Sequence, residues 1–347
     1  YDEEGKKEYE GFMVDGVKMG YGIEYSNDIE RVIYEGCFCD DKRFGRGVLY
    51  DRNGIIEYNG LWKNDSTYCD QFDGNTIDCY TESVSINYDS FNEVKSFIHN
   101  SFLYSLKWIT IGDSCFGKVR VFELDGLGEL ESVVIGKECF TYAKTYDDIW
   151  NSKRSDGSCR IVNCPKLKSI QIGYHSFSDY HSFELSNLPS LQSIEIGEYC
   201  FFVVRSFSLT DLPQLQSVIL GYAAFEFVHS VVFENLPKLQ SIRLSRFALQ
   251  GDYRDDRETI STKPYNFKNT LTMRNLPSLT EFKGDEFNFK HIDSVILENI
   301  PRLSSNGINF GDGYECFYYT HSLQSSNAAA LESYIRQIGR ASCRERV

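Results

Sequence analysis

The 347-residue chain contains no run of 18 apolar residues, so no membrane-spanning helix is expected. It also lacks an excess of positive charge. Lys and Arg total 36 against 50 Asp and Glu, which gives a formal net charge of −14. This balance argues against binding to nucleic acid and against electrostatic attachment to anionic lipid. The sequence opens at Tyr1 without Met or an apolar leader, so we expect a fragment, and a lost signal peptide stays open.

Motifs for metal binding and catalysis are lacking as well. Eleven cysteines are present, but none forms a Cys-x-x-Cys pair. Cys37 and Cys39 alternate, so their thiols would face opposite sides of a strand. The six histidines show no His-Glu-x-x-His spacing, and no nucleophile elbow precedes a helix. We therefore expect no metal site, no cofactor and no catalytic residues, and we predict that the chain is not an enzyme.

What the sequence does contain is a period of 24 residues. Leu167-Lys-Ser-Ile-Gln-Ile-Gly173 returns as Leu191-Gln-Ser-Ile-Glu-Ile-Gly197, and twice more along the chain. A fixed period in this range predicts stacked coils, in which neighbours complete a core that one coil cannot bury alone. The anchor position of the period is occupied by Leu106, Leu130, Leu167, Leu191, Leu215, Leu239, Leu279 and Leu303.

Each coil is predicted to hold two short strands. Apolar residues three and five after the anchor, such as Ile194 and Ile196, alternate as in a strand with one buried face. A second alternating run, such as Ser206-Phe-Ser-Leu209, follows a turn. Six of the seven prolines lie two residues before an anchor leucine, outside the strands. Two residues before each stands Asn or Asp, which we expect to bond its own turn and the next coil's backbone in a ladder.

The motif Ile172-Gly-Tyr-His-Ser-Phe177 recurs as Ile196-Gly-Glu-Tyr-Cys-Phe201 and Leu220-Gly-Tyr-Ala-Ala-Phe225. This pattern resembles leucine-rich repeats, and most closely their BspA-like type. The resemblance implies a leucine-rich-repeat solenoid over residues 84–323. It implies little about function, because such repeats serve many different partners.

Residues 1–65 carry a different repeat. Tyr9-Glu10-Gly11 recurs as Tyr34-Glu35-Gly36 and Tyr58-Asn59-Gly60, and Gly20-Tyr-Gly22 recurs as Gly45-Arg-Gly47. Short alternating runs separated by turn residues, such as Asp15-Gly16 and Asn53-Gly54, predict β-hairpins. The fold class expected for the whole chain is therefore mainly β with little helix: a hairpin array followed by a solenoid with two short strands per coil.

Tyr58-Asn-Gly-Leu-Trp62 and the Gly-x-Gly pairs resemble MORN repeats, although Cys37 and Phe38 stand where the earlier unit should show its Trp. The resemblance implies an array of hairpins that mediates protein contacts, in some cases beside membranes. Membrane association is therefore expected only through this module, and the charge of the chain does not favour it.

The remaining segments interrupt or end the repeats. Residues 66–83 are polar and turn-rich and are expected to be a junction. The period is broken near residues 141–157 and 250–267, after the Phe position each time, which predicts two exposed insertions on one edge. Residues 324–337 are expected to form a helical cap, with helix at 327–337. Residues 338–347 resemble a translated sequencing adapter, and we set them aside from the fold.

One column of the repeat, just before the Phe, is always small. Cys115, Cys139, Cys200 and Cys316 share it with Ser176, Ala224 and Ala248. We interpret the column as a packing slot and expect Cys115, Cys139 and Cys200 to be buried, reduced thiols without metal. The mixture of Ser, Ala and Cys also favours a reducing compartment.

A second column varies freely. It lies midway between the two apolar positions of the first strand and should point outward. An outward column without constraint is typical of a recognition face, and equally of plain solvated surface; one sequence does not separate the two. Tyr142, Tyr146 and Trp150 of the first insertion mix aromatics with charge, as binding hot spots do. The outward column comprises Thr110, Val134, Gln171, Glu195, Ile219, Arg243 and Lys283.

The function predicted from the sequence is a non-catalytic, cytoplasmic interaction scaffold whose solenoid face binds a protein partner. One alternative is a surface or secreted adhesion protein of the BspA-like kind. Another is the regulatory part of a larger enzyme or signalling protein whose catalytic domain lies beyond the ends of this sequence.

Overall fold

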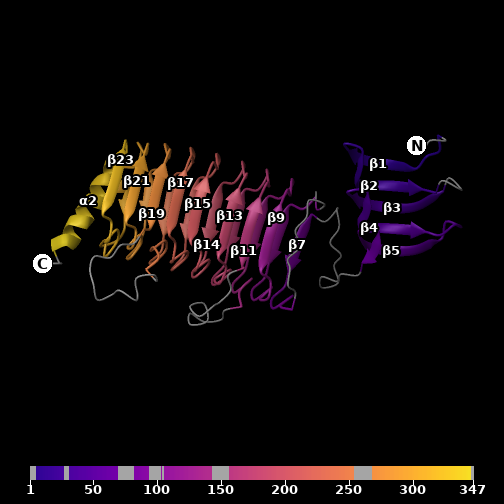
Figure 1. Cartoon of the computed structure of the whole chain (residues 1–347), viewed down its shortest axis with the longest axis horizontal. Coiled ribbons are helices and arrows are strands. Elements are labelled where there is room, and N and C mark those ends of the chain that lie inside the picture. Colours follow the sequence, from indigo (N-terminus) through magenta and orange to yellow (C-terminus); the bar gives the residue numbers. More distant parts are fainter. Residues whose placement is uncertain are drawn as a thin grey trace. The chain divides into compact units, whose positions relative to one another are not determined.

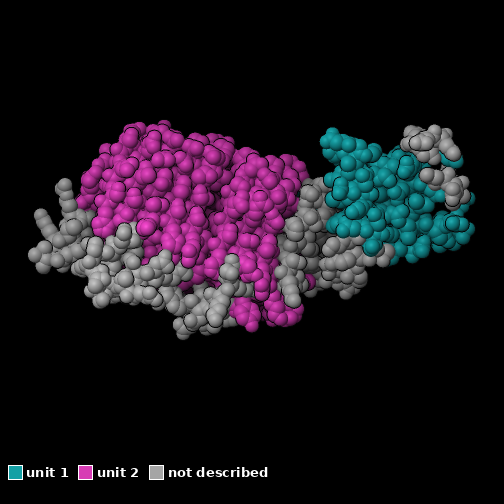
Figure 2. Space-filling view, in the orientation of Figure 1, with its two compact units in different colours: residues 1–84, 100–107 teal, residues 85–99, 108–347 magenta. Residues whose placement is uncertain are grey.

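The computed structural model describes residues 5–26, 31–68, 82–93, 103, 105–142, 156–253 and 268–344. Their strands form an antiparallel sheet near the N-terminus and a stack of parallel coils after it, with a single α-helix at the end (Figure 1). The predicted fold class, mainly β with a hairpin array and a two-strand solenoid, is confirmed. The chain divides into two compact units, residues 1–84 with 100–107 and residues 85–99 with 108–347 (Figure 2).

The first unit is a sheet of six antiparallel strands in sequence order. Its tight turns use residues with positive φ, among them the predicted Asp15-Gly16 pair at 50° and 85°. The last strand corrects the sequence prediction, because Ser66–Tyr68 extend the sheet into the segment expected to be a junction. The strands are β1 (Tyr9–Val14), β2 (Val17–Tyr25), β3 (Val32–Cys39), β4 (Lys42–Tyr50), β5 (Ile56–Lys63) and β6 (Ser66–Tyr68).

Glycine and tyrosine define this sheet together. The ring of Tyr34 lies over Gly36 and Gly47, where any Cβ would collide with it. Phe38 packs edge-on against Tyr34 with ring centroids 5.1 Å apart, much as Trp62 packs against Tyr58 at 5.4 Å. Phe38 therefore takes the place of the tryptophan that the earlier repeat lacks. The register of β3 and β4 shifts between Gly36 and Phe38. Cys37 and Cys39 therefore do not follow the strict alternation that the sequence suggested.

The second unit is the solenoid, and the first strand of every coil joins one parallel sheet of nine strands. Ser169, Ser193, Ser217 and Ser241 are direct partners in it, so the 24-residue period sets the register. The insertions leave the register intact, since Ser132 also pairs with Ser169. The strands are β7 (Ser83–Ile86), β8 (Trp108–Ile111), β10 (Ser132–Ile135), β12 (Ser169–Ile172), β14 (Ser193–Ile196), β16 (Ser217–Leu220), β18 (Ser241–Leu244), β20 (Glu281–Lys283) and β22 (Ile308–Asn309).

The second strands form two separate parallel sheets. The first contains β9 (Val121–Asp125), β11 (Ser158–Val162) and β13 (Ser182–Ser186). The other contains β15 (Ser206–Thr210), β17 (Ser230–Glu234), β19 (Thr270–Arg274), β21 (Ser294–Glu298) and β23 (Ser322–Ser326). Pairing stops between β13 and β15, although the first strands of the same two coils, β12 and β14, remain paired.

A left-handed turn connects the two strands of a coil. In the coil of β12, His175 and Phe177 have φ of 59° and 55°, on either side of the small Ser176. The two left-handed residues aim their backbone N–H groups at opposite neighbouring coils: His175 donates to the carbonyl of Glu198, and Phe177 to that of Cys139. The Phe rings stack in consequence, with centroids 4.7 Å apart for Phe140 and Phe177 and 5.1 Å apart for Phe177 and Phe201.

The core is made of the predicted columns. Every anchor leucine from Leu106 to Leu303 is buried, as are the apolar positions of the first strands. The residue after an anchor commonly donates to a carbonyl one coil earlier, as Gln216 does to Gln192 at 2.8 Å. The anchors therefore lie in adjacent coils of one continuous core, as predicted.

The Asn column forms the expected ladder, but by different bonds. Asn187 Nδ2 donates to Asn163 Oδ1 at 2.8 Å, and Asn235 Nδ2 to Asp211 Oδ1 at 2.8 Å. The rungs thus join side chain to side chain, not side chain to backbone. No rung joins Asn187 to Asp211 within the described residues, since an ionised Asp can accept but not donate. The gap coincides with the missing pairing between β13 and β15.

The C-terminal end departs from the sequence prediction. Residues 324–326 belong to β23, and helix α2 (Ala329–Arg344) continues past residue 337 into the segment that the sequence analysis set aside. No proline follows Gln337 to stop the helix. Leu331 and Ile335 of α2 are buried, and the helix packs beside β23 at the end of the stack (Figure 1). A short 3₁₀ turn, η2 (Ser305–Gly307), precedes β22.

Leu215→Ala should lower the free energy of unfolding of the solenoid by about 2–5 kcal/mol, because the side chain is fully buried and truncation leaves a cavity. Urea unfolding followed by circular dichroism measures the change. Gln216→Ala, an exposed neighbour, is the control and should change little. An unchanged unfolding midpoint for Leu215→Ala would show that the anchor column does not carry the core.

Asp211→Asn should raise the free energy of unfolding by about 0.5–1.5 kcal/mol, because the amide can donate to Asn187 and still accept from Asn235. The reverse change, Asn235→Asp, removes the donor of an existing rung and should be destabilising. Both are measured by the same urea titration. Equal destabilisation by the two variants would rule out the ladder as a source of stability.

Candidate interaction surfaces

The structure brings the predicted outward column together as one row, which we call the outward row. Thr110, Val134, Gln171, Glu195, Ile219, Arg243 and Lys283 are direct strand partners along the nine-stranded sheet. All are exposed except Val134, which is half-buried. Ile219, with 37% of its surface exposed, is the largest apolar side chain that the row exposes. The row is therefore a straight, accessible line across seven coils.

The positive charges of Arg243 and Lys283 in the outward row are partly neutralised by Glu281 of the neighbouring column. Arg243 Nε lies 2.6 Å from Glu281 Oε1, and Lys283 Nζ lies 3.3 Å from the same oxygen. The bond from Arg243 lowers the pKa of Glu281. Glu195, in contrast, has no ion pair among the described residues. The polar character of the row thus changes from paired charges at β18 and β20 to free polar and apolar groups at β12 to β16.

The insertion residues stand apart from the outward row. Tyr142 is 68% exposed and follows the Phe140 turn, and its backbone N–H lies 3.4 Å from Asp179 Oδ2. Tyr146 and Trp150 lie outside the described residues, as does most of the second insertion. The described ends of both segments are at the same turn: Tyr142 follows Phe140, and Tyr253 follows Leu249 of the Phe column. Thr141, Gln250 and Asp252 at these ends are buried, which differs from the predicted exposure, and the exposure of the remaining residues of the two loops stays a prediction.

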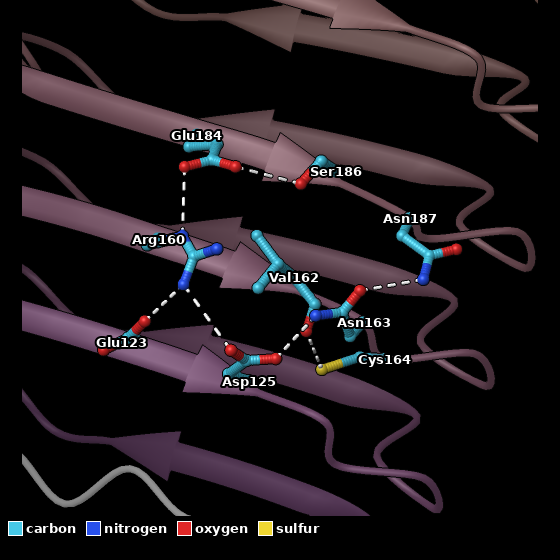
Figure 3. Close-up of polar contacts among 9 residues, drawn as sticks. All are labelled: Glu123, Asp125, Arg160, Val162, Asn163, Cys164, Glu184, Ser186 and Asn187. Atoms are coloured by element: carbon cyan, nitrogen blue, oxygen red, sulfur yellow. Dashed lines mark hydrogen bonds and ion pairs between the residues drawn. The ribbon is translucent and has the colours of Figure 1, made fainter.

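The outward face of the second strands is occupied by ion pairs. Arg160 of β11 lies between Glu123 and Glu184 of the flanking coils, 3.0 Å from Glu184 Oε2, with Asp125 at 3.5 Å (Figure 3). The two glutamates raise the pKa of the guanidinium, Glu123 most. Pairs this exposed contribute little stability. Because these charged side chains pair with one another, this face offers a binding partner fewer unpaired groups than the outward row does.

An aromatic surface that the sequence analysis missed lies at the turn after the first strand. We call Tyr174, Glu198, Tyr199 and Tyr222 the tyrosine edge. Tyr174, Glu198 and Tyr222 each follow the glycine that ends a first strand, in three successive coils. Tyr199 lies 6.1 Å from Tyr174 and 5.2 Å from Tyr222 between ring centroids. Tyr174 is 39% exposed, and the other two tyrosines are half-buried.

The tyrosine edge leaves a weak signal in the sequence. Its aromatic side chain follows the glycine directly in two coils, but in the coil between it comes one residue later, at Tyr199. Because neither position is aromatic in every coil, comparing the repeats one position at a time does not reveal the tyrosine edge. Comparing the two positions after the glycine together would have shown one aromatic ring in each coil.

The small column does more than fill space. Cys139 Sγ and Cys200 Sγ each lie 3.0 Å from a glycine carbonyl oxygen of the preceding coil, and Ser176 Oγ donates to another at 2.8 Å. The predicted burial of Cys115, Cys139 and Cys200 is confirmed, and all three are free thiols. Their column is thus a line of weak donors that tie each turn to the coil before it.

Cys37 differs from these thiols, because it forms a disulfide. Its partner lies outside the described residues. Reduced thiols were predicted only for the small column, and this disulfide lies outside it, in the first unit.

Within the described residues no cluster of three or more His, Cys, Asp or Glu side chains has the geometry to hold a metal ion. No helix in the described part of the chain is long and apolar enough to cross a membrane.

Labelling with a maleimide should be slow in the native protein at Cys115, Cys139 and Cys200, and fast in denaturant, because the thiols are inaccessible in the fold. As pH rises, Cys115 should react first of the three. The bond from Cys139 lowers the pKa of Cys115, whereas burial raises that of Cys200 to about 12. The half-buried Cys39 is the internal reference. Mass spectrometry locates the labels, and equal native labelling of all four would contradict the fold.

Comparison with protein-family models, with curated proteins and with solved structures found no match to this chain.

Proposed function

We propose that the chain is a non-catalytic interaction scaffold that binds a protein partner along the outward row. The observation that carries the proposal is the register. It sets seven side chains of unlike character in one exposed line, while the columns on either side repeat Ser, Ile and Leu. A rigid sheet with a variable outer row is the form in which repeat proteins present extended binding surfaces. The MORN resemblance, which is typical of scaffolds, agrees with it.

The centre of the proposed surface is Ile219 of β16 with Glu195 of β14 and Gln171 of β12. Covering the exposed Ile219 side chain removes apolar surface from water, and the unpaired Glu195 and Gln171 beside it can select a partner that supplies complementary polar groups. The paired charges around Glu281 then form its rim, where ion pairs affect the rate of association more than affinity.

A photo-crosslinking amino acid at position 219 or 195 should capture one and the same protein from an extract of the source organism. The matched control position is Ser206, which is exposed at the start of β15 on the second strands. With the captured protein purified, Ile219→Asp should weaken binding by at least tenfold and leave the unfolding midpoint unchanged. Capture of the same protein with equal yield from position 206, or full binding by Ile219→Asp, would refute the proposal.

The second candidate function is a surface or secreted adhesion protein, and one observation favours it. The disulfide at Cys37 is typical of an oxidising compartment. Against it, the other seven described cysteines are free, which agrees with the cytoplasmic location that we propose. A leader peptide encoded ahead of Tyr1 in the complete gene would decide for the adhesion protein.

A further inference from the structure

The tyrosine edge combines three aromatic rings with one exposed carboxylate. The rings of Tyr174 and Tyr199 are nearly perpendicular, at 88°, and Tyr222 is tilted by 58° from Tyr199. Glu198 occupies the coil between Tyr174 and Tyr222, at the equivalent position. The side chain of Glu198 is exposed and has no ion pair among the described residues. Faces of aromatic rings and a free carboxylate both attract a cation.

The surroundings of the edge are negative as well. Burial and then the neighbours Tyr222, Tyr174 and Glu226 raise the pKa of Tyr199 to about 12. Glu138, one coil before Tyr174, has no ion pair among the described residues either. Arg246, in the coil after Tyr222, pairs with Glu286 at 3.0 Å, and Lys137, in the coil before Tyr174, has no ion pair among the described residues. Glu198 thus has no ion-pair partner in the described part of the chain, and the one unpaired cation of its row is Lys137.

The same chain shows what fills such an arrangement. Arg246 occupies the same row as Tyr174 and Tyr222, in the coil directly after that of Tyr222. Its guanidinium lies 5.0 Å from the ring centroids of both Phe247 and Phe287, and it pairs with Glu286. The first unit repeats the combination: Arg43 lies 4.9 Å from the ring of Tyr34 and pairs with Glu24 at 2.7 Å. The first unit holds Lys18 in the same way, 5.1 Å from the ring of Tyr9 and 5.7 Å from that of Phe38, with Glu24 at 2.9 Å. In all three places aromatic rings and one glutamate hold one cation.

From this recurrence we infer that the tyrosine edge binds an arginine side chain of the protein partner. Tyr174 and Tyr222 provide ring faces for the guanidinium plane, and Glu198 accepts its N–H groups. Arginine fits better than lysine, because a planar guanidinium stacks on a ring and donates to a carboxylate in a fork at the same time. The inference rests on the proposed function, since it names the kind of partner segment that the solenoid receives.

The probe is a fluorescein-labelled octapeptide of alternating Gly and Arg, followed by fluorescence anisotropy at 150 mM salt. We expect saturable binding, at least threefold tighter than that of the matching Gly-Lys peptide. Glu198→Gln and Tyr174→Leu should each weaken binding at least fivefold, and Tyr174→Phe, which keeps the ring, should restore it. The control is Glu57→Gln, which removes the same charge from an exposed position of β5, outside both proposed surfaces, and should change affinity less than twofold.

Equal losses from Glu198→Gln and Glu57→Gln would overturn the inference, because they would reveal general attraction to an acidic protein. Absence of saturable binding by the wild type would overturn it too. Thermal unfolding of each variant verifies the fold, and the exposed positions of Tyr174 and Glu198 make intact folding the expected result. The two proposals fail separately. If a partner is crosslinked from position 219 but the peptide does not bind, only the arginine site is rejected. If the peptide binds but no protein is crosslinked from positions 195 and 219, the outward row is rejected.

Discussion

The solenoid depends on the left-handed backbone at the turn between its two strands. Phe177, Phe201 and Phe225 all have φ between 51° and 55°, a conformation that costs a non-glycine residue about 1–2 kcal/mol. The structure recovers this cost in two ways. The left-handed residues direct each N–H at a carbonyl in an adjoining coil, and they place the rings in a continuous stack. Without this turn the chain could not pass from one sheet to the next and keep every coil in register.

Much of the fold could be predicted, because period and register are the same property. A leucine every 24 residues implies that equivalent residues of successive coils lie next to one another. The core columns, the strands and the stacking could therefore be predicted from the sequence. The hydrogen bonds did not. An Asn column can bond backbone or side chains with equal chemical sense, and only the geometry shows Asn187 bonded to Asn163. The end of α2 was missed for a related reason: Gly339 weakens a helix but does not stop one.

The candidate surfaces were predictable only in part. The outward row follows directly from alternation, so its members could be named before the structure was known. The tyrosine edge could not be found that way, because Tyr199 and its neighbours alternate between two adjacent positions and meet only when the coils are stacked. The disulfide at Cys37 is a different case, since sequence spacing carries no information about pairing between distant cysteines.

The break beside Asp211 gives the stack unequal sides. The nine first strands run through it without interruption, whereas the second strands stop pairing between β13 and β15. At the boundary between these two coils, hydrogen bonds connect only the first strands, so the second strands can separate there with no backbone bond to break. We therefore expect the curvature of the solenoid to change chiefly at this coil boundary, so that coils on either side of it can tilt to match the contour of a bound surface.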